Sequence, residues 1–149
     1  MKVVLQRVSE ASCTVEGKVT GKIGAGLCLF VGFCEGDDEA LLQKMIDKIL
    51  GLRIFSDAQG KMNLSVLQIG GSVLSISQFT LYASCKKGRR PSFDKAAPSK
   101  TASILYDRFN VLLAKQIPVE TGIFGADMKI ALVNDGPVTI VLDSDEVFA

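Results

Sequence analysis

The segment Ser77-Gln78-Phe79-Thr80 follows an apolar run, where a strand of a sheet protein would end and where such proteins often carry functional groups. Its hydroxyls and amide could position a substrate, and Thr80 could act as a nucleophile if a base lay beside it. The chain contains no histidine, which excludes Ser-His-Asp and Cys-His catalysis. Lysine is the conventional base that remains, and no pattern places a lysine beside Thr80. The segment is therefore either a functional site or the polar end of a strand.

A dense group of positive charges, here called the basic cluster, lies shortly after this segment. It consists of Lys86, Lys87, Arg89 and Arg90. The whole chain has 17 Lys and Arg against 16 Asp and Glu, so the cluster is a local patch on a nearly neutral protein. It predicts either a solvated loop or a loop that contacts nucleic-acid phosphates. Its small extent fits one end of an RNA better than a long duplex.

A third unusual segment, Asn134-Asp135-Gly136-Pro137, lies between two apolar stretches. Its composition predicts a hairpin turn, and an X-Pro bond in a folded protein is cis in about 5–6% of cases. If the Gly136–Pro137 bond is cis, two successive carbonyl groups point the same way. Such a pair of acceptors could bind an amine with backbone atoms alone.

Strands are predicted where Val, Ile and Leu are dense. They cover residues 1–9 and 12–15 with a break near Glu10, residues 27–33 as a strand covered on both faces, residues 72–82 running into a loop, and residues 128–133 and 138–142 joined by a turn at 134–137. The glycines of residues 21–26 follow the order G-x-x-G-x-G, the reverse of a dinucleotide-binding loop, and no helical pattern comes after them. We expect a hairpin turn there.

Two helices are predicted between these strands. Asp37 and Asp38 can cap the first helix, whose apolar residues recur on one stripe as far as Gly51. The second begins near Pro98 or Ser99 and carries Ile104, Leu105, Phe109, Leu112 and Leu113. This order of elements predicts an α/β fold in which helices pack on one side of a mixed sheet.

Composition places the chain in a broad class. Its 149 residues fit a single domain over residues 1–149, and its 48% hydrophobic content leaves apolar surface that favours an oligomer. The cysteines lack the spacing of a zinc or redox motif, so reduced thiols are expected. The first residues lack a signal stretch and no apolar run could span a membrane. We expect a cytoplasmic protein without membrane contact.

Several motifs together resemble the D-aminoacyl-tRNA deacylase family in its bacterial and eukaryotic form. They lie in order over nearly the whole chain: Gln6-Arg7-Val8, Arg53-Ile54-Phe55-Ser56-Asp57, Gly60-Lys61-Met62-Asn63-Leu64, Gly70-Gly71-Ser72-Val73, Ser77-Gln78-Phe79-Thr80-Leu81, Arg90-Pro91-Ser92-Phe93 and Asn134-Asp135-Gly136-Pro137-Val138-Thr139. A sister branch that acts on misacylated L-alanine also has a Gly-Pro pair, and the Ser-Gln-Phe-Thr form indicates the D-selective branch. Ala83-Ser84-Cys85 departs from the family pattern in a variable loop.

The resemblance implies a homodimeric α/β fold of three layers, with active sites shared between subunits. Gly136 and Pro137 of one subunit, joined by a cis peptide bond, would face the segment Ser77 to Thr80 of the other. Arg7 would hold the Gly-Pro carbonyls in place, and Phe124 would line the pocket. The two carbonyls would bind the α-amino group of the substrate and drive an L side chain into the backbone.

The implied reaction is hydrolysis of the ester between a D-amino acid and the 3′ end of tRNA. Glycyl-tRNA mischarged on alanine tRNA would also enter, because glycine has no side chain to reject. The resemblance assigns catalysis to Ser77, Gln78, Phe79 and Thr80: backbone amides near Phe79 and Thr80 stabilise the oxyanion, Gln78 orients the ribose, and the 2′-hydroxyl of the tRNA assists. In another interpretation Thr80 is the nucleophile. The basic cluster would bind RNA, and no cofactor and no protein metal site are implied.

Two rival functions fit the same residues. One is a noncatalytic module that binds RNA or DNA through the basic cluster, with salt-dependent binding and no turnover. The other is a small-molecule esterase or amidase with a threonine nucleophile, which would act on free esters without tRNA.

Overall fold

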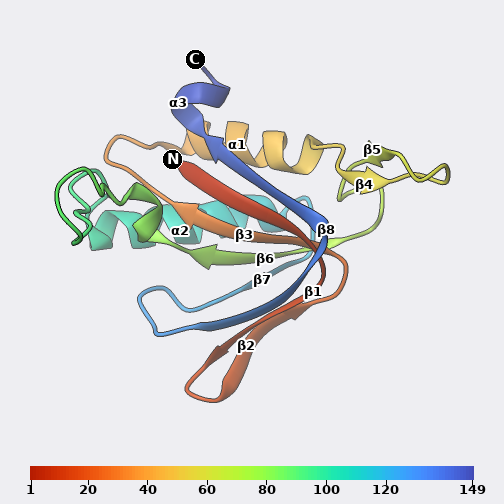
Figure 1. Ribbon diagram of the computed structural model, residues 1–149, viewed down its shortest axis with the longest axis horizontal. Helices are drawn as coiled ribbons and strands as arrows, with labels where there is room; N and C mark the ends of the chain where they lie inside the picture. The colour runs from red at the N-terminus through yellow and green to blue at the C-terminus, as the bar shows by residue number, and fades with distance from the viewer.

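The sheet is organised around β1 (Lys2–Val15), a 14-residue strand that is paired along both of its edges. The computed structural model describes residues 1–149. On one edge, β1 pairs antiparallel with β2 (Lys18–Ile23) and β3 (Gly26–Gly32), and on the other edge it pairs with β8 (Lys129–Asp143) (Figure 1). All later elements are placed relative to this strand.

Two parallel strands extend the sheet beyond β3. β6 (Ser72–Ser77) pairs with β3, and β7 (Val119–Thr121) pairs with β6, so the sheet is mixed. Parallel neighbours require a crossover connection, which is usually a helix. α1 (Glu39–Gly51) lies in the first crossover and α2 (Ser99–Ala114) lies in the second. The predicted α/β fold with a mixed sheet is therefore confirmed.

The remaining elements are short. β4 (Phe55–Ser56) and β5 (Met62–Leu64) form a separate hairpin that projects from the body beyond α1 (Figure 1). The 3₁₀ helix η1 (Phe79–Tyr82) follows β6, and α3 (Ser144–Val147) follows β8. No helix of this protein combines the length and the apolar character needed to cross a membrane.

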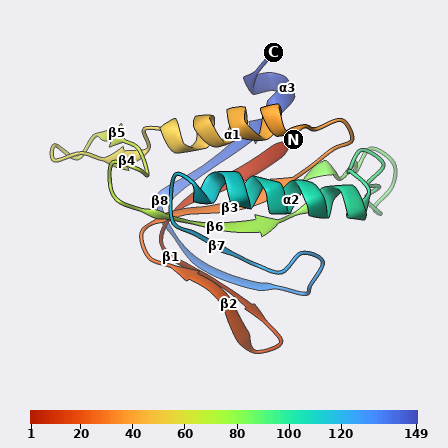
Figure 2. The same cartoon turned by 180° about the vertical axis from the view of Figure 1, so that it is seen from behind.

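Both long helices cover the same face of the sheet (Figure 2). α1 begins where the Asp38 carboxylate accepts a hydrogen bond from the Leu41 amide at 2.8 Å, which is the predicted N-cap. The apolar stripes of α1 and α2 pack on the sheet and form the main core. Among the apolar residues predicted on the second helix, Phe109 and Leu113 are buried, whereas Ile104 lies on the outer side of α2 and is 62% exposed.

β3 is covered on both faces, as predicted. Leu27, Leu29 and Val31 belong to the main core, whereas Cys28 lies in a second, smaller core on the opposite face. Residues from the far halves of β1 and β8 complete this second core, so these halves fold over β3 and β6. All four cysteines are free thiols. Burial, and then the neighbouring Cys13, raise the pKa of the Cys28 thiol to about 12.

The predicted hairpin at residues 134–137 is wrong. Both halves of β8 pair antiparallel with β1, so the chain does not reverse direction there. The ladder is interrupted between Asn134 and Thr139, where residues 135–138 lie opposite Arg7 alone and bulge from the strand. Asn, Asp, Gly and Pro favour turns and bulges alike, and the pairing with β1 decides between them.

Two further sequence predictions are corrected by the pairing of β1. The strand continues through Glu10, where a break was expected, and its register against β8 shifts there. Residues 21–26 form no hairpin, because β2 runs on into β3 along the same edge of β1. The reverse turn lies earlier, at Glu16 and Gly17, which both have positive φ. Hydrogen bonds along both edges hold β1 extended over residues that favour strands weakly on their own.

We expect Gly26→Ala to lower the free energy of unfolding by about 2–3 kcal/mol. A Cβ atom added there would lie 1.8 Å from the Ser72 carbonyl oxygen, a backbone atom of β6. Gly51→Ala is the matched control, because a Cβ at that position in α1 would meet nothing within 4 Å. We expect Gly51→Ala to stabilise the protein by at most about 1 kcal/mol. Urea denaturation followed by circular dichroism measures both, and equal stability of the two variants would contradict the close approach of β3 and β6.

Candidate active site

A cavity of about 620 Å³ opens at the end of β6. It is lined by the junction of β6 and η1 (residues 76–79), by residues 93 and 96–99, by Ala102 of α2, and by residues 124–126, 128 and 130 between β7 and the start of β8. Ten of its 15 lining residues are hydrophobic, which is typical of a pocket for an organic ligand. Its side-chain polar atoms come from Ser77, Gln78 and Ser99.

The polar edge of the cavity forms where β6 ends. The strand predicted over residues 72–82 stops at Ser77, and the Gln78 amide donates to the Val31 carbonyl at 2.8 Å in the last bond between β6 and β3. The chain then turns into η1. The Gln78 side-chain amide donates a hydrogen bond to the Thr80 hydroxyl at 2.5 Å. Thr80 does not line the cavity, but its hydroxyl holds the side chain of Gln78, which does.

η1 is held close to β3. A Cβ atom at Gly32 would lie 2.9 Å from the Gln78 carbonyl oxygen, so this approach requires glycine. At the other end of η1, Tyr82 is buried, and the Lys2 ammonium lies 5.2 Å from the centre of its ring. Burial, and then the neighbouring Cys34, raise the pKa of the Tyr82 phenol above its usual range. Tyr82 is therefore a neutral anchor for the segment that carries Gln78.

An aromatic pair closes one side of the cavity. The Phe79 ring is 55% exposed and meets the Phe93 ring edge to face, with centroids 4.9 Å apart. On the opposite wall, Phe124 packs against the buried Tyr106 of α2, with centroids 6.0 Å apart. Phe124, to which the family resemblance assigns a place in the substrate pocket, is one of the residues that line this cavity.

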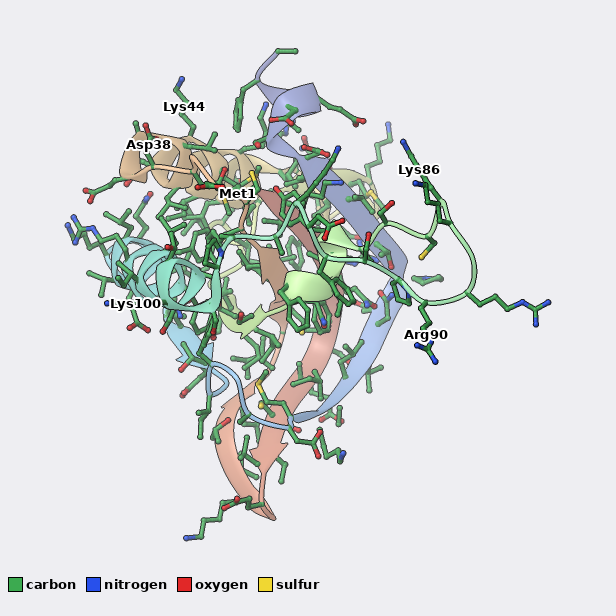
Figure 3. All side chains as sticks on the ribbon, turned by 90° about the vertical axis from the view of Figure 1, so that its left-hand side faces the viewer. Met1, Asp38, Lys44, Lys86, Arg90 and Lys100 are labelled. Atoms are coloured by element: carbon green, nitrogen blue, oxygen red, sulfur yellow. The ribbon has the colours of Figure 1, made fainter.

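The basic cluster lies on a loop whose two ends are joined. Ser84 and Ser92 exchange both backbone hydrogen bonds, at 2.8 and 3.0 Å, and so close the loop between them. Figure 3 shows Lys86 and Arg90 extending from this loop, away from Lys100 at the start of α2. All four side chains of the cluster are exposed and none forms an ion pair. Phe93, which lines the cavity, follows this loop directly in the chain, whereas none of the four basic residues lines it.

The Gly136–Pro137 segment lies outside the cavity of its own chain, in the exposed bulge of β8. Its peptide bond is cis. The Arg7 guanidinium donates to the Asp135 carbonyl at 2.8 Å and to the Ile54 carbonyl at 2.6 Å, so it ties the bulge to the segment before β4. Gly136 has φ +134°, and a Cβ there would lie 2.7 Å from Nη2 of Arg7. The positive φ therefore favours glycine, and a Cβ atom would displace the Arg7 guanidinium that holds the bulge.

Asn134 closes the bulge from inside. Its side-chain oxygen accepts a hydrogen bond from the Val138 amide at 3.1 Å. Its side-chain nitrogen donates to Gln6 at 2.6 Å and to Thr139 at 3.0 Å. The bulge is thus held across its base by one side chain and from outside by Arg7, although Asp135, Gly136 and Pro137 are exposed.

The structure brings together some of the predicted site residues and separates others. Ser77, Gln78, Phe79 and Phe124 line one cavity, and Thr80 contacts it through Gln78. Arg7, Gly136 and Pro137 form a second group in the bulge, and the basic cluster forms a third. Sequence reasoning missed the supporting role of Asn134 and the part of the cavity wall from Phe93 to Ala102. The small and apolar residues of the wall carry no chemical signal by which the sequence could identify them. Asn134 did carry one, because Asn side chains commonly form hydrogen bonds with nearby backbone groups.

No group of three or more Cys, Asp or Glu side chains that could hold a metal ion is present.

This chain matches one family model and is similar to a number of solved structures. A family model described as D-Tyr-tRNA(Tyr) deacylase matches residues 4–143. A solved structure described as c-Myc DNA Unwinding Element Binding Protein is 41% identical, with a TM-score of 0.91 over 96% of this chain and 98% of that chain. Another, described as a probable eukaryotic D-amino acid tRNA deacylase, has a TM-score of 0.79 and 19% identity over 95% of this chain and 97% of that chain. At that identity the second structure indicates a shared fold.

We expect Asn134→Ala to destabilise the protein by about 1–2 kcal/mol and to speed hydrogen exchange of the Val138 amide by about tenfold, because that amide loses its acceptor. Asp135→Ala is the control in the same bulge. The Asp135 carboxylate is exposed and lies 4.0 Å from Arg7, and the Asp135 carbonyl that Arg7 binds is retained. It should change stability by about 0.5 kcal/mol or less. Unchanged exchange at Val138 in Asn134→Ala would refute the clamp.

Proposed function

The chain belongs to the D-Tyr-tRNA(Tyr) deacylase family, and from this premise we propose that the cavity at the end of β6 is its active site and that the Gly136–Pro137 bulge is its chiral filter. As a member of the family, the protein is a hydrolase that cleaves the ester of D-aminoacyl-tRNA, and tRNA is its substrate. The observation that carries the proposed arrangement is the rigid, exposed bulge, which lies outside the cavity of its own chain.

In the proposed site, the apolar cavity receives the terminal adenosine and its ester. Gln78 orients the ribose, and backbone amides near Phe79 and Thr80 donate to the oxyanion that forms during hydrolysis. An aminoacyl ester already hydrolyses at a slow rate without a catalyst, and the neighbouring 2′-hydroxyl of the tRNA can assist. The protein therefore needs to supply little more than these hydrogen bonds. Thr80 is assigned a positioning role. Its hydroxyl is bonded to the amide nitrogen of Gln78, which is a donor and does not act as a base.

The basic cluster is proposed to hold the phosphates next to the terminal nucleotide. Its charges are exposed and unpaired, and the loop that carries them ends at Phe93, on the cavity wall. Lysine and arginine contacts to phosphate supply affinity and orientation without reading sequence. A patch of this size fits the single-stranded 3′ end of a tRNA.

The bulge is proposed to enter the cavity of a second subunit in a homodimer. The carbonyls of Gly136 and Pro137 would then bind the α-ammonium group of the substrate. A D side chain would point outward, and an L side chain would collide with the backbone of the bulge. Glycine has no side chain to reject, so glycyl-tRNA is accepted. Arg7 and Asn134 hold the carbonyls in position, and a filter that works by exclusion requires such rigidity.

The proposal is tested by hydrolysis of D-Tyr-tRNA, L-Tyr-tRNA and glycyl-tRNA with labelled amino acids. We expect the D-ester and the glycyl ester to be cleaved at least about 100-fold faster than the L-ester. Free D-tyrosine ethyl ester should remain uncleaved, which separates this activity from that of a small-molecule esterase. Equal cleavage of the D- and L-esters would support the enzymatic activity and would refute the chiral filter.

Cleavage of no ester by the folded protein would favour the noncatalytic alternative. A relative 41% identical to this chain is described as a DNA unwinding element binding protein, and the exposed basic cluster could contact a DNA backbone in the same way. Binding of duplex DNA would then depend on salt and on the basic cluster, and it would not respond to changes at Gln78 or Pro137.

Sharing of the site between subunits is tested by mixing two inactive variants. Gln78→Ala alters the cavity, and Gly136→Ala alters the bulge by placing a Cβ against Arg7. After subunit exchange in an equal mixture, half of the dimers are mixed and each mixed dimer has one intact site. We expect D-Tyr-tRNA hydrolysis of about a quarter of the native rate. An exchanged mixture no more active than its separate components would show that the bulge does not serve the partner's cavity.

A further inference from the structure

The Ser75 carbonyl joins three elements beneath the cavity. Ser75 is a fully buried residue of β6. Its carbonyl oxygen accepts a buried hydrogen bond from the Tyr106 hydroxyl of α2 at 2.7 Å and a second bond from the Gly122 amide, at the end of β7, at 3.3 Å. The stronger of the two bonds is thus made by a side chain, and it ties the helix layer to the sheet.

Both walls of the cavity begin at this junction. Two residues after Ser75, β6 ends at Ser77, the first polar residue of the cavity edge. β7 ends at Thr121, and the chain that follows Gly122 forms the second wall, which contains Phe124. The Tyr106 ring also packs against Phe124. One side chain therefore touches the strand that ends in the first wall and an aromatic residue of the second.

Gly122, from which the second wall starts, is closely packed. A Cβ atom at Gly122 would lie 2.4 Å from the Met128 sulfur and 3.3 Å from the Cys13 sulfur. Two contacts connect this wall to β6: the Gly122 amide donates to the Ser75 carbonyl, and the Tyr106 ring, whose hydroxyl donates to the same carbonyl, packs against Phe124. Burial raises the pKa of the Tyr106 phenol, so the hydroxyl stays protonated and remains a donor.

Stability alone gives no reason for the two polar side chains of Ser75 and Asn110. Ser75 Oγ and Asn110 Oδ1 lie buried in the same layer between β6 and α2 and have no hydrogen-bond partner. Buried polar groups without partners destabilise a protein, and apolar residues of the same shape would pack there at least as well. Polar groups in an otherwise apolar layer are better explained by a need to set the distance between β6 and α2 than by a need for stability.

We infer that Tyr106 is a positioning residue for deacylation, whose hydroxyl sets the separation between the Ser77 edge and the Phe124 wall of the cavity. The inference rests on the proposed location of the active site in this cavity. A change in that separation would misalign the ester with the groups that stabilise its transition state, and small misplacements have large effects on rate. Affinity for tRNA would change little, because no residue of the basic cluster takes part in the junction of Ser75, Tyr106 and Gly122.

The test compares Tyr106→Phe with Phe109→Leu, a change in the same helix at a buried ring that packs on Phe33. Both variants should lower Tm by about 5 °C and remain folded at 25 °C. We expect Tyr106→Phe to lower kcat for D-Tyr-tRNA about tenfold with KM within about twofold of the native value. Phe109→Leu should keep the native kcat. Equal kcat in the two variants would overturn the inference and leave the proposed function intact.

A second measurement separates this inference from the proposed function itself. In backbone NMR spectra of Tyr106→Phe, the amide signals of Ser77 and Phe124 should both shift, and in Phe109→Leu both should stay near their native positions. This readout does not depend on turnover. Unshifted Ser77 and Phe124 signals would refute the positioning role even if the native protein cleaved no ester.

Discussion

Pairing along both edges of β1 is the constraint on which the rest of the structure depends. One edge aligns β2 and β3, and β3 in turn fixes the parallel strand β6 that ends at the cavity. The other edge holds both halves of β8 and forces residues 135–138 to bulge opposite Arg7. The cavity edge and the bulge are therefore positioned by opposite sides of the same strand. Arg7 is itself a residue of β1, so the side chain that supports the bulge moves with the strand that creates it.

The chain belongs to a family of hydrolases yet contains no histidine, so the proposed active site has to rely on geometry. Its cavity is mostly apolar, and hydrogen bonds in such surroundings are stronger than in water. The ester substrate is reactive enough that oriented donors and an assisting hydroxyl of the RNA can suffice. The demanding task is then selection, and the proposed filter uses backbone carbonyls that Arg7 and Asn134 hold from two sides. Tyr106 would serve the cavity as Asn134 serves the bulge, by fixing distances between segments that are far apart in sequence.

The helices could be predicted because their signals are local. Asp38 caps α1 and its apolar stripe repeats at helical spacing, so the residues that define the helix lie within one another's reach. The strand predictions failed where long-range pairing competes with local preference. Residues 134–137 have the composition of a hairpin, yet pairing with β1 on both sides keeps the chain extended past them. The sequence names the apolar residues of the second helix, but the packing partner decides which of them are buried, and Ile104 stays exposed.

By itself, the sequence determined the fold class, the family and the residue types available for chemistry. It contained the Ser-Gln-Phe-Thr segment, the basic cluster and the Gly-Pro pair, and it lacked histidine. The tertiary structure decided how these groups are distributed: Ser77, Gln78, Phe79 and Phe124 share a cavity, whereas Gly136 and Pro137 lie outside it. It also revealed Asn134 and Tyr106 as supports, because their partners depend on strand register and on helix packing. Residue types follow from the chain alone. The distances between segments far apart in the sequence are set only when the strands pair along both edges of β1.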